Sequence, residues 1–300
     1  MNCVDKQYIE IVKDVLANGH LVPTRAKING NNVSAYTVFG RQARFKLLHS
    51  FPILTTKKVS FDSIAHEVVW FLSGDSNIKY LQDNKVKIWD AWADKDGELG
   101  FGTYGTLWRK FPNHQTKAFD NYGEGNFFQE IVFCENQPVD QIKELINNIE
   151  AVKKDPTASC GRRLIVTAWH PYYVDKVGLP PCHCLFQFHV NNKYLSCQLY
   201  QRSCDLFLGV PFNITSYCLL LSVIAKITNL VPHEFVHTYG DLHIYENHVE
   251  QLQDQIEREP MDLPQLWINP ELNSIDDFVR SDVKLIDYNH RGVLRGEVAV

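Results

Sequence analysis

The residues best placed to do chemistry in this sequence are Cys182 and Arg202. Cys182 follows two prolines and begins an alternating, aromatic-rich run, and Arg202 ends a second such run. Two runs of this kind around the polar break at Asn191 and Asn192 are typical of a β-hairpin. A turn at those asparagines would place Cys182 opposite Gln201, and a three-residue turn would place it opposite Arg202. Because a nearby guanidinium favours the nucleophilic thiolate, the hairpin is predicted to present an activated cysteine.

A second candidate is Glu67, which lies on a predicted helix that begins near Ser60 and ends at Gly74. Its spacing places it on the same face as Ile64 and Phe71. A carboxylate on an apolar face is costly unless it is hydrogen-bonded or protonated, so we expect a raised pKa. Glu67 is therefore either a structural buried acid or a group that handles protons.

Several other residues allow both a structural and a functional interpretation. Trp89, near a glycine-rich turn, is either a core residue or part of an aromatic wall for a flat ligand. The pair Arg162 and Arg163 precedes a predicted strand and is either solvated or part of an anion site. Asn213 either caps a helix or recognises a heterocyclic edge with its amide. A lone His243 is more often structural than functional.

The composition is that of an ordinary globular protein. Of 300 residues, 45% are hydrophobic and 22% are charged, and the formal net charge is −5. This acidic balance argues against general nucleic-acid binding, so an anionic substrate would need a local arginine cluster. No apolar run is long enough to span a bilayer, and residues 1–19 lack the apolar core of a secretory signal. We therefore expect a cytoplasmic protein without membrane or obligatory nucleic-acid partners.

The eight cysteines are scattered, so reduced thiols are expected rather than a disulfide framework. Cys182 and Cys184 flank His183, which could hint at a metal site. Successive strand residues point to opposite faces, however, and no second ligand pair has zinc spacing. The sequence predicts no metal.

No repeat or linker interrupts the chain, which predicts a single domain over residues 1–300. Residues 21–32 resemble a polar loop, 111–138 an irregular insertion, and 209–213 a tight connection into an apolar helix. The predicted elements are helices at 1–19, 60–74, 139–154 and 216–230, another helix opening at 240, and strands at 36–47, 164–169, 235–239, 266–268 and 283–286.

Motifs distributed over nearly the whole chain resemble the thymidylate synthase family. They lie at residues 55–57, 66–72, 88–90, 162–163, 180–183, 201–205, 208–213, 240–245 and 298–300, in family order. The resemblance implies an α+β fold: a mixed β-sheet with flanking helices in three layers, forming a dimer through sheet packing.

The resemblance also implies reductive methylation of deoxyuridylate (dUMP) to thymidylate (dTMP) with 5,10-methylenetetrahydrofolate as co-substrate. The Cys182 thiolate would add to carbon 6 of dUMP, assisted by Arg202. Glu67 would move protons at the uracil carbonyl through water, and Tyr104 would help to remove the carbon-5 proton. Asn213 would hydrogen-bond to the uracil edge.

The remaining implied contacts divide between nucleotide and folate. Arg162 and Arg163 would reach the phosphate of a neighbouring subunit, which implies a homodimer with shared active sites. Residues 26–32 depart from the threonine–glycine loop usual in the family, so Lys27 is an alternative to Arg25 at the phosphate. The other implied nucleotide contacts are Arg25, Gln201, Arg202, Ser203, Asp205, Asn213, His243 and Tyr245. The implied folate contacts are Lys57, Trp89, Leu179, Asp205, Gly209, Phe212 and Ala299.

Three rival functions are weighed against this one. A pyrimidine-nucleotide hydroxymethylase of the same superfamily would add water instead of hydride, but Trp89 and the tail at 298–300 favour water exclusion. A catalytically silent nucleotide- or RNA-binding regulator is disfavoured by the acidic balance and the full catalytic set. A cysteine hydrolase is disfavoured because no His–Asn or His–Asp pattern accompanies Cys182.

Overall fold

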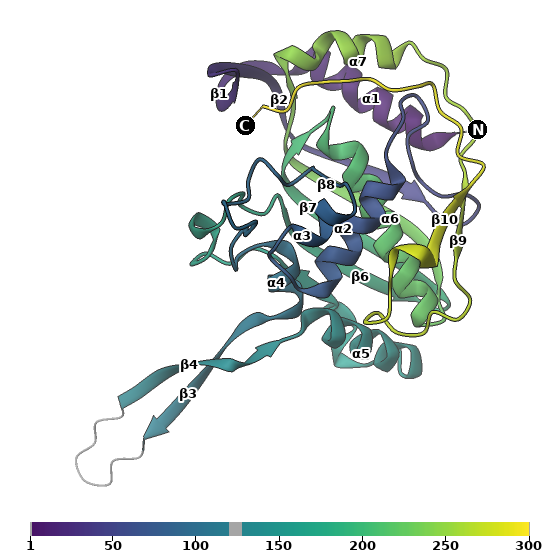
Figure 1. Cartoon of the computed structure of the whole chain (residues 1–300). Helices are drawn as coiled ribbons and strands as arrows, with labels where there is room; N and C mark the ends of the chain where they lie inside the picture. The colour runs from purple at the N-terminus through teal and green to yellow at the C-terminus, as the bar shows by residue number, and fades with distance from the viewer. Residues whose placement is uncertain (1, 120–127, 300) are drawn as a thin grey trace.

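A six-stranded mixed sheet forms the centre of the molecule (Figure 1). The computed structural model describes residues 2–119 and 128–299. Strands β7 and β8 run parallel, and every other neighbouring pair in the sheet is antiparallel. The mixed sheet with flanking helices confirms the predicted α+β class. In spatial order the strands are β1 (His20–Ile28), β2 (Asn31–Lys46), β8 (Val231–Tyr245), β7 (Tyr194–Asp205), β6 (His183–Asn191) and β5 (Ile165–Thr167).

The first two long helices end where their capping residues predict. In α2 the Ser60 hydroxyl accepts a hydrogen bond from the Ser63 N–H, and Gly74 closes the helix at φ 71°. Helix α1 ends at Gly19, whose N–H donates to the Val15 carbonyl. The helices are α1 (Cys3–Asn18), α2 (Phe61–Ser73), α3 (Lys79–Asp83), α4 (Tyr104–Arg109), α5 (Gln141–Lys154), α6 (Gly209–Ile227) and α7 (Val249–Ile256).

Helix α6 begins at Gly209, well before the predicted start at Ser216. Pro211 is tolerated there because the N–H groups of a first helical turn have no acceptor within the helix. Asn213 therefore lies inside α6 and not in a preceding connection. Among the described residues, α6 is the one helix long and apolar enough to cross a membrane, but 78% of that stretch is buried inside the protein, as in a core helix.

Strand β8 continues through Gly240, so the helix predicted to open there is wrong. The register of β8 with β2 runs from Lys46 opposite Glu234 to Ala35 opposite Tyr245. A side chain at position 240 would lie 2.9 Å from the Arg202 carbonyl oxygen, so glycine allows the neighbouring strand to approach closely. His243 and Tyr245 are consequently strand residues.

The predicted polar loop at 21–32 is instead a hairpin formed by β1 and the start of β2. Asn29 (φ 49°) and Gly30 (φ 82°) form its turn, and positive φ at both central residues is typical of a type I′ hairpin. A register shift between Pro23 and Lys27 interrupts the pairing around Arg25. The sequence already contains the signal for this hairpin turn, the dipeptide Asn29-Gly30.

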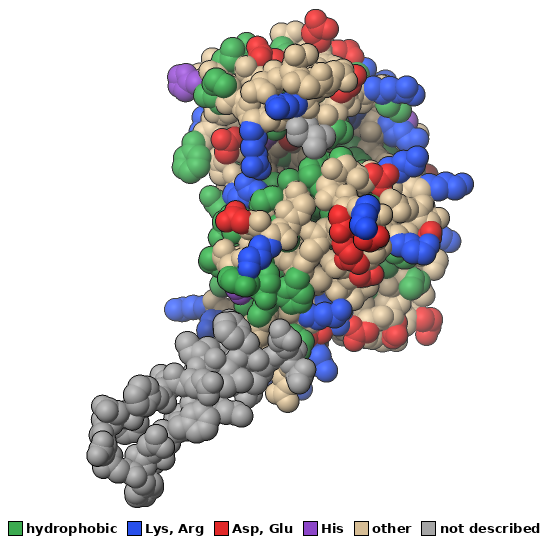
Figure 2. Space-filling model, turned by 60° about the vertical axis from the view of Figure 1, so that its left-hand side comes forward, with side chains coloured by type: hydrophobic (Ala, Val, Ile, Leu, Met, Phe, Trp, Pro, Cys, Tyr) green, Lys and Arg blue, Asp and Glu red, His purple; other side chains and the backbone are tan. Residues whose placement is uncertain are grey.

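The insertion at 111–138 is not irregular where the structure describes it. Strands β3 (Phe111–Phe119) and β4 (Phe128–Val139) pair antiparallel and project from the body (Figure 1); residues 120–127 lie outside the described part. Hydrophobic side chains gather on the body beside the base of this projection (Figure 2). There the rings of Phe111 and His170 lie 5.4 Å apart.

Near the C-terminus, β9 (Gln265–Ile268) and β10 (Val283–Ile286) pair as a separate two-stranded sheet, at the predicted positions.

Candidate active site

Cys182 directly precedes β6 and lies opposite Arg202 on β7. The Arg202 N–H donates to the Cys182 carbonyl at 2.8 Å. Its guanidinium donates from Nε to the Pro181 carbonyl at 3.0 Å and from Nη2 to the Pro180 carbonyl at 2.9 Å. The two prolines thus give Arg202 fixed acceptors, and the guanidinium is held beside the thiol.

The hairpin reaches this register by a route that the sequence did not predict. Asn191 pairs with Tyr194, so the turn lies at residues 192–193, one residue later than predicted. That turn alone would place Cys182 opposite Ser203, and a register shift between His183 and Leu185 moves it opposite Arg202 instead of the predicted Gln201.

Burial raises the pKa of the Cys182 thiol above its ordinary value. The Arg202 charge and a hydrogen bond with Ser203 act in the opposite direction but do not reverse the shift. Arg202 therefore lowers the thiol pKa, as predicted. The expectation of a lowered pKa is nevertheless wrong for the ligand-free chain, because burial raises the pKa by more.

Tyr104, at the start of α4, lies directly behind the nucleophile. Its hydroxyl oxygen accepts hydrogen bonds from the backbone N–H groups of Cys182 at 2.7 Å and His183 at 3.3 Å. Burial raises its pKa well above the ordinary value, so Tyr104 is a neutral hydroxyl. Such a group can orient a water molecule by donating its O–H.

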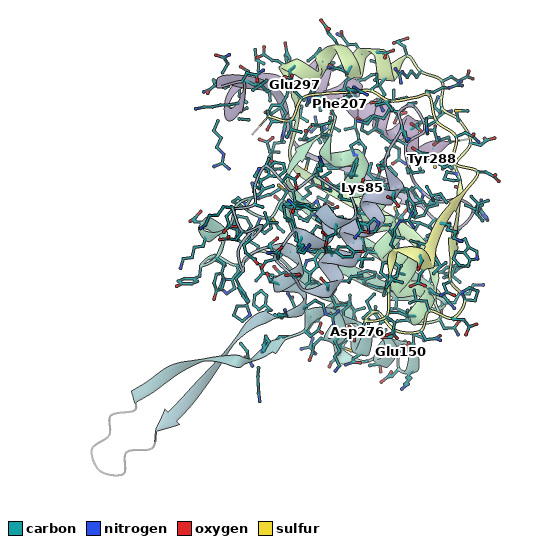
Figure 3. All side chains as sticks on the ribbon, in the orientation of Figure 1. Lys85, Glu150, Phe207, Asp276, Tyr288 and Glu297 are labelled. Carbon is teal, nitrogen blue, oxygen red and sulfur yellow. The ribbon has the colours of Figure 1, made fainter. Side chains whose placement is uncertain are left out.

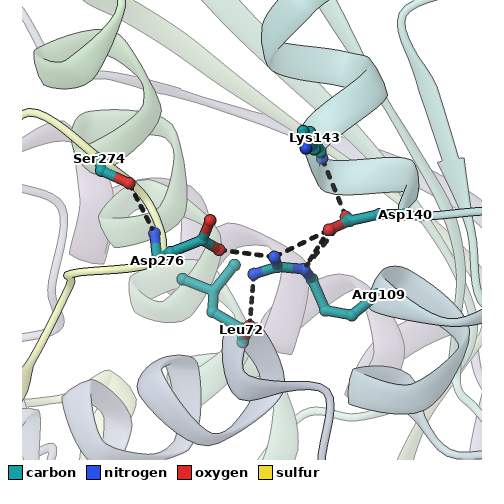
Figure 4. Close-up of polar contacts among 6 residues, drawn as sticks. All are labelled: Leu72, Arg109, Asp140, Lys143, Ser274 and Asp276. Atoms are coloured by element: carbon teal, nitrogen blue, oxygen red, sulfur yellow. Dashed lines mark hydrogen bonds and ion pairs between the residues drawn. The ribbon is translucent and has the colours of Figure 1, made fainter.

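Arg109 holds α4 in this position (Figure 4). It donates to the Asp140 carboxylate through Nε and Nη2, to Asp276 at 2.6 Å, and to the Leu72 carbonyl at 2.7 Å. These bonds tie the helix of Tyr104 to the last turn of α2 and to the N-cap of α5. Sequence reasoning assigned Arg109 no role, since its carboxylate partners are 31 and 167 residues away.

Glu67 faces the aromatic wall, where the Trp89 indole N–H donates to its carboxylate at 2.8 Å. Burial raises the pKa of Glu67 to about 7, and the Trp89 bond acts against this rise. The Trp89 ring also lies 6.0 Å from the Tyr104 ring. Glu67 is therefore buried near the Cys182 cluster and titrates near neutral pH, as a proton-handling group should.

A buried polar chain supports Asn213. Gln201 donates from Nε2 to the Asn213 Oδ1 at 3.0 Å, and its own Oε1 lies 2.8 Å from the His237 Nε2. His183 also hydrogen-bonds to the Asn213 side chain, while burial lowers the His183 pKa to about 4. The amide of Asn213 is thus fixed from behind by neutral groups. His237 was not singled out from the sequence, because a lone buried histidine carries no local signal.

The residues predicted to contact the sugar and the phosphate lie within β1 and at the end of β8. His243 Nδ1 lies 2.9 Å from the Asp241 carboxylate, and its ring is 5.1 Å from that of Tyr245. Arg25 is close enough for its charge to oppose the burial that raises the Tyr245 pKa.

In contrast, Arg162 ends a short 3-10 helix before edge strand β5, and Arg163 follows it. Both are exposed, and Arg163 donates to the Ser159 hydroxyl.

Asp205, at the end of β7, lies near two of the predicted folate residues, Lys57 and Gly209. Asp205 Oδ1 accepts from the Phe207 N–H at 2.8 Å and the Leu208 N–H at 3.2 Å, which orients the carboxylate. Lys57 donates to the Phe207 carbonyl, and burial lowers its pKa to about 7. A carboxylate oriented in this way can accept hydrogen bonds from the N–H groups at the edge of a flat heterocycle. The predicted folate residues Leu179 and Phe212 are half-buried and pack against the core.

Gly209 and Ala299 complete the predicted folate set. A side chain at Gly209 would lie 3.5 Å from Asn213 Oδ1 and 3.8 Å from the Asp205 Cβ, so this glycine separates the two side chains. Ala299 is half-buried near the end of the C-terminal tail.

The family comparison covers the same residues as this site. A family model described as Thymidylate synthase matches residues 6–300. That span includes the Cys182 hairpin, the Glu67 helix, the Asp205 loop and the tail. Together these segments hold almost all the candidate site residues described above. The chain therefore belongs to the thymidylate synthase family, a group of methyltransferase-type enzymes.

Proposed function

We propose that this chain is a thymidylate synthase that converts dUMP to dTMP with 5,10-methylenetetrahydrofolate. The observation that carries the proposal is the fixed group of Cys182, Arg202 and Tyr104. The thiol, the guanidinium and the hydroxyl are each held by backbone contacts of the same hairpin. Family membership supports the reaction class.

Cys182 attacks carbon 6 of the uracil ring as a thiolate, which makes carbon 5 nucleophilic. Two N–H groups of Arg202 point to the proline carbonyls, and the rest of its five N–H bonds can bind the phosphate. The same side chain therefore favours the thiolate and positions the nucleotide.

Asn213 and Glu67 act on the uracil base. With its Oδ1 oriented by Gln201, Asn213 offers an acceptor to the base N–H and its amide N–H to the neighbouring carbonyl. Glu67, with a pKa of about 7, exchanges a proton with that carbonyl through water. The neutral Tyr104 hydroxyl helps to remove the carbon-5 proton by orienting the water that takes it.

The folate, when bound, supplies the one-carbon unit and the hydride. Asp205 would hold the pterin edge, and Leu179, Trp89 and Phe212 would enclose its faces and exclude water. Ala299 would close the site from the tail.

The active unit is proposed to be a homodimer that forms through the sheet face left open by the helices. Leu185 and Tyr200 are cross-strand partners on this face, with exposed fractions of 38% and 37%, and Ile165 on the next strand is 45% exposed. Large apolar side chains exposed on neighbouring strands are typical of an interface. Across it, Arg162 and Arg163 would reach the phosphate bound by the partner.

Subunit complementation tests the shared site. Chains with Cys182→Ser are mixed with Arg162→Ala/Arg163→Ala chains under conditions that exchange subunits. A charge-assisted bond contributes about 1.5–3 kcal/mol, so losing both arginines should weaken dUMP binding more than about tenfold. A heterodimer holds one site with both defects and one with neither, so activity should return. Confirmed exchange without recovered activity would contradict the shared site.

The reaction itself is tested by following dihydrofolate formation with dUMP and methylenetetrahydrofolate, with uridylate in a parallel assay. We expect dihydrofolate and dTMP in equal amounts. A hydroxymethylated nucleotide with tetrahydrofolate would instead identify the hydroxymethylase reaction, and no nucleotide product would refute both. The Cys182→Ser chain is the matched control.

A further inference from the structure

The C-terminal tail runs alongside α7 (Figure 1). Its first part is fixed to the segment before α2. The Tyr288 hydroxyl donates to the Leu54 carbonyl at 2.7 Å, and the Arg291 N–H donates to the Thr55 carbonyl at 2.8 Å. The Gly292 carbonyl accepts from the Lys58 N–H at 2.7 Å. These anchors leave the last residues to be held by other contacts.

Three side chains, two just before α7 and one in its first turn, contact the backbone of these last residues. Asn247 Nδ2 donates to the Glu297 carbonyl at 3.3 Å, and His248 Nε2 lies 2.9 Å from the same oxygen. Gln251 Nε2 donates to the Arg295 carbonyl at 3.4 Å. Because a carbonyl only accepts, His248 must carry its proton on Nε2.

The other polar atom of each side chain is unpaired. In the part of the chain that the structure describes, Asn247 Oδ1, His248 Nδ1 and Gln251 Oε1 are buried without a hydrogen-bond partner. Each side chain therefore donates a hydrogen bond to the tail while its own acceptor atom stays buried and unpaired. A buried unpaired acceptor ordinarily costs free energy. Three donors converging on two backbone carbonyls form a site whose ligand is the tail.

The held segment lies against the loop that follows Asp205. A side chain at Gly296 would lie 2.5 Å from Phe207 Cε1 and 2.7 Å from His248 Nε2, so the tail is in close contact with both rings. Those rings are 4.6 Å apart. Glu297 and Phe207 accordingly lie close together at one end of the molecule (Figure 3). The position of the tail is thus coupled directly to the candidate folate loop.

We infer that Asn247, His248 and Gln251 are positioning residues that latch the tail over the Asp205 loop. The latch keeps Ala299 at the folate site and so keeps water away from the reacting nucleotide. The existence of the latch stands on the contacts alone. Its consequence for the product rests on the proposed function, because only then does water compete with hydride at the exocyclic methylene group of the nucleotide.

The first experiment uses the ligand-free full-length chain. Carboxypeptidase digestion is followed by mass spectrometry for the wild type, Asn247→Ala/Gln251→Ala and Gln253→Ala. Gln253 lies on the same helix but is exposed, so it is a matched control. We expect the double variant to lose its last residues at least fivefold faster, with the control within twofold of the wild type. Equal rates for all three chains would overturn the latch.

The second experiment measures product partition with dUMP and methylenetetrahydrofolate. When water adds to the exocyclic methylene, the nucleotide gains a hydroxymethyl group and the folate leaves unoxidised as tetrahydrofolate. We expect the hydroxymethyl fraction to rise at least fivefold in the double variant and not in the control. Faster digestion with unchanged partition would overturn the water-excluding role. If the wild type yields no dihydrofolate, the proposed function is refuted. The digestion result would then still decide whether the latch exists.

Discussion

Glu67→Gln should make the folded chain more stable at neutral pH while removing its activity. Glu67 is buried, and burial raises its pKa from the ordinary value of 4.5 to about 7. Below pH 4.5 the carboxyl is protonated in both folded and unfolded chains, so it places no charge in the interior. As the pH rises toward 7, ionisation favours the unfolded chain, and the wild type loses stability. Glutamine never ionises and escapes this loss.

The magnitude follows from the two pKa values. At about 1.36 kcal/mol per pKa unit, the separation between 4.5 and about 7 corresponds to roughly 3 kcal/mol. By linkage, the advantage of Glu67→Gln should be about 1 kcal/mol at pH 5, about 2 at pH 6, and about 3 from pH 7 upward. The Trp89 bond is retained, since the glutamine oxygen can still accept from the indole N–H.

Urea unfolding at fixed protein concentration, repeated from pH 4.5 to pH 8, measures this difference. Glu144→Gln, on the exposed face of α5, controls for the change in net charge. A Glu67→Gln advantage that does not grow with pH would refute the argument that Glu67 is held near neutral pH by burial. Dihydrofolate formation by this variant should fall at least a hundredfold, which separates proton handling from a structural role.

Three further changes test other parts of the site. Cys182→Ser should abolish turnover and leave dUMP binding by calorimetry within about threefold, because the hydroxyl does not ionise near neutral pH; turnover within tenfold of the wild type would contradict its role as nucleophile. Asn213→Asp should shift the ratio of kcat/KM values from dUMP toward deoxycytidylate, whose amino edge an asparagine oriented by Gln201 meets poorly; an unchanged ratio would make Asn213 a structural residue. Arg109→Met should lower the free energy of unfolding in urea by about 2 kcal/mol, since its partly buried bonds to Asp140 are charge-assisted; a loss below about 0.5 kcal/mol would show that the clamp on α4 is dispensable.

Local signals predicted the elements that depend on local chemistry. Ser60 and Gly74 bound α2 because a hydroxyl satisfies a free N–H at one end and glycine accepts the left-handed conformation at the other. The prediction was wrong where tertiary pairing decides. Residues 240–245 remain a strand because they pair with β2 as far as Tyr245 and with β7 as far as His243, and both partner strands are distant in the sequence. The β3–β4 hairpin was missed because its run is rich in polar and aromatic residues without a clear alternating face.

The site was predicted as a set of residues but not as a geometry. Motifs placed Cys182, Tyr104 and Glu67 on separate elements, and the fold brings them to one aromatic-lined region. The residues that position them depend on contacts between distant segments, such as Arg109 with Asp276. Such pairs carry no sequence pattern, so they became visible only in the folded chain.

The state of the Cys182 thiol shows most clearly what folding adds to sequence. The sequence supplies a cation opposite the nucleophile, and that cation does lower the thiol pKa, yet burial outweighs it in the ligand-free chain. A thiol kept mostly protonated is protected from adventitious alkylation and oxidation, since the thiolate is the reactive form. The proline carbonyls fix Arg202 beside it before any nucleotide arrives, so no reorganisation is needed when charge develops on sulfur. The nucleotide must then be attacked by the small thiolate fraction, and product formation should accelerate with rising pH until Glu67, with its pKa of about 7, is largely ionised.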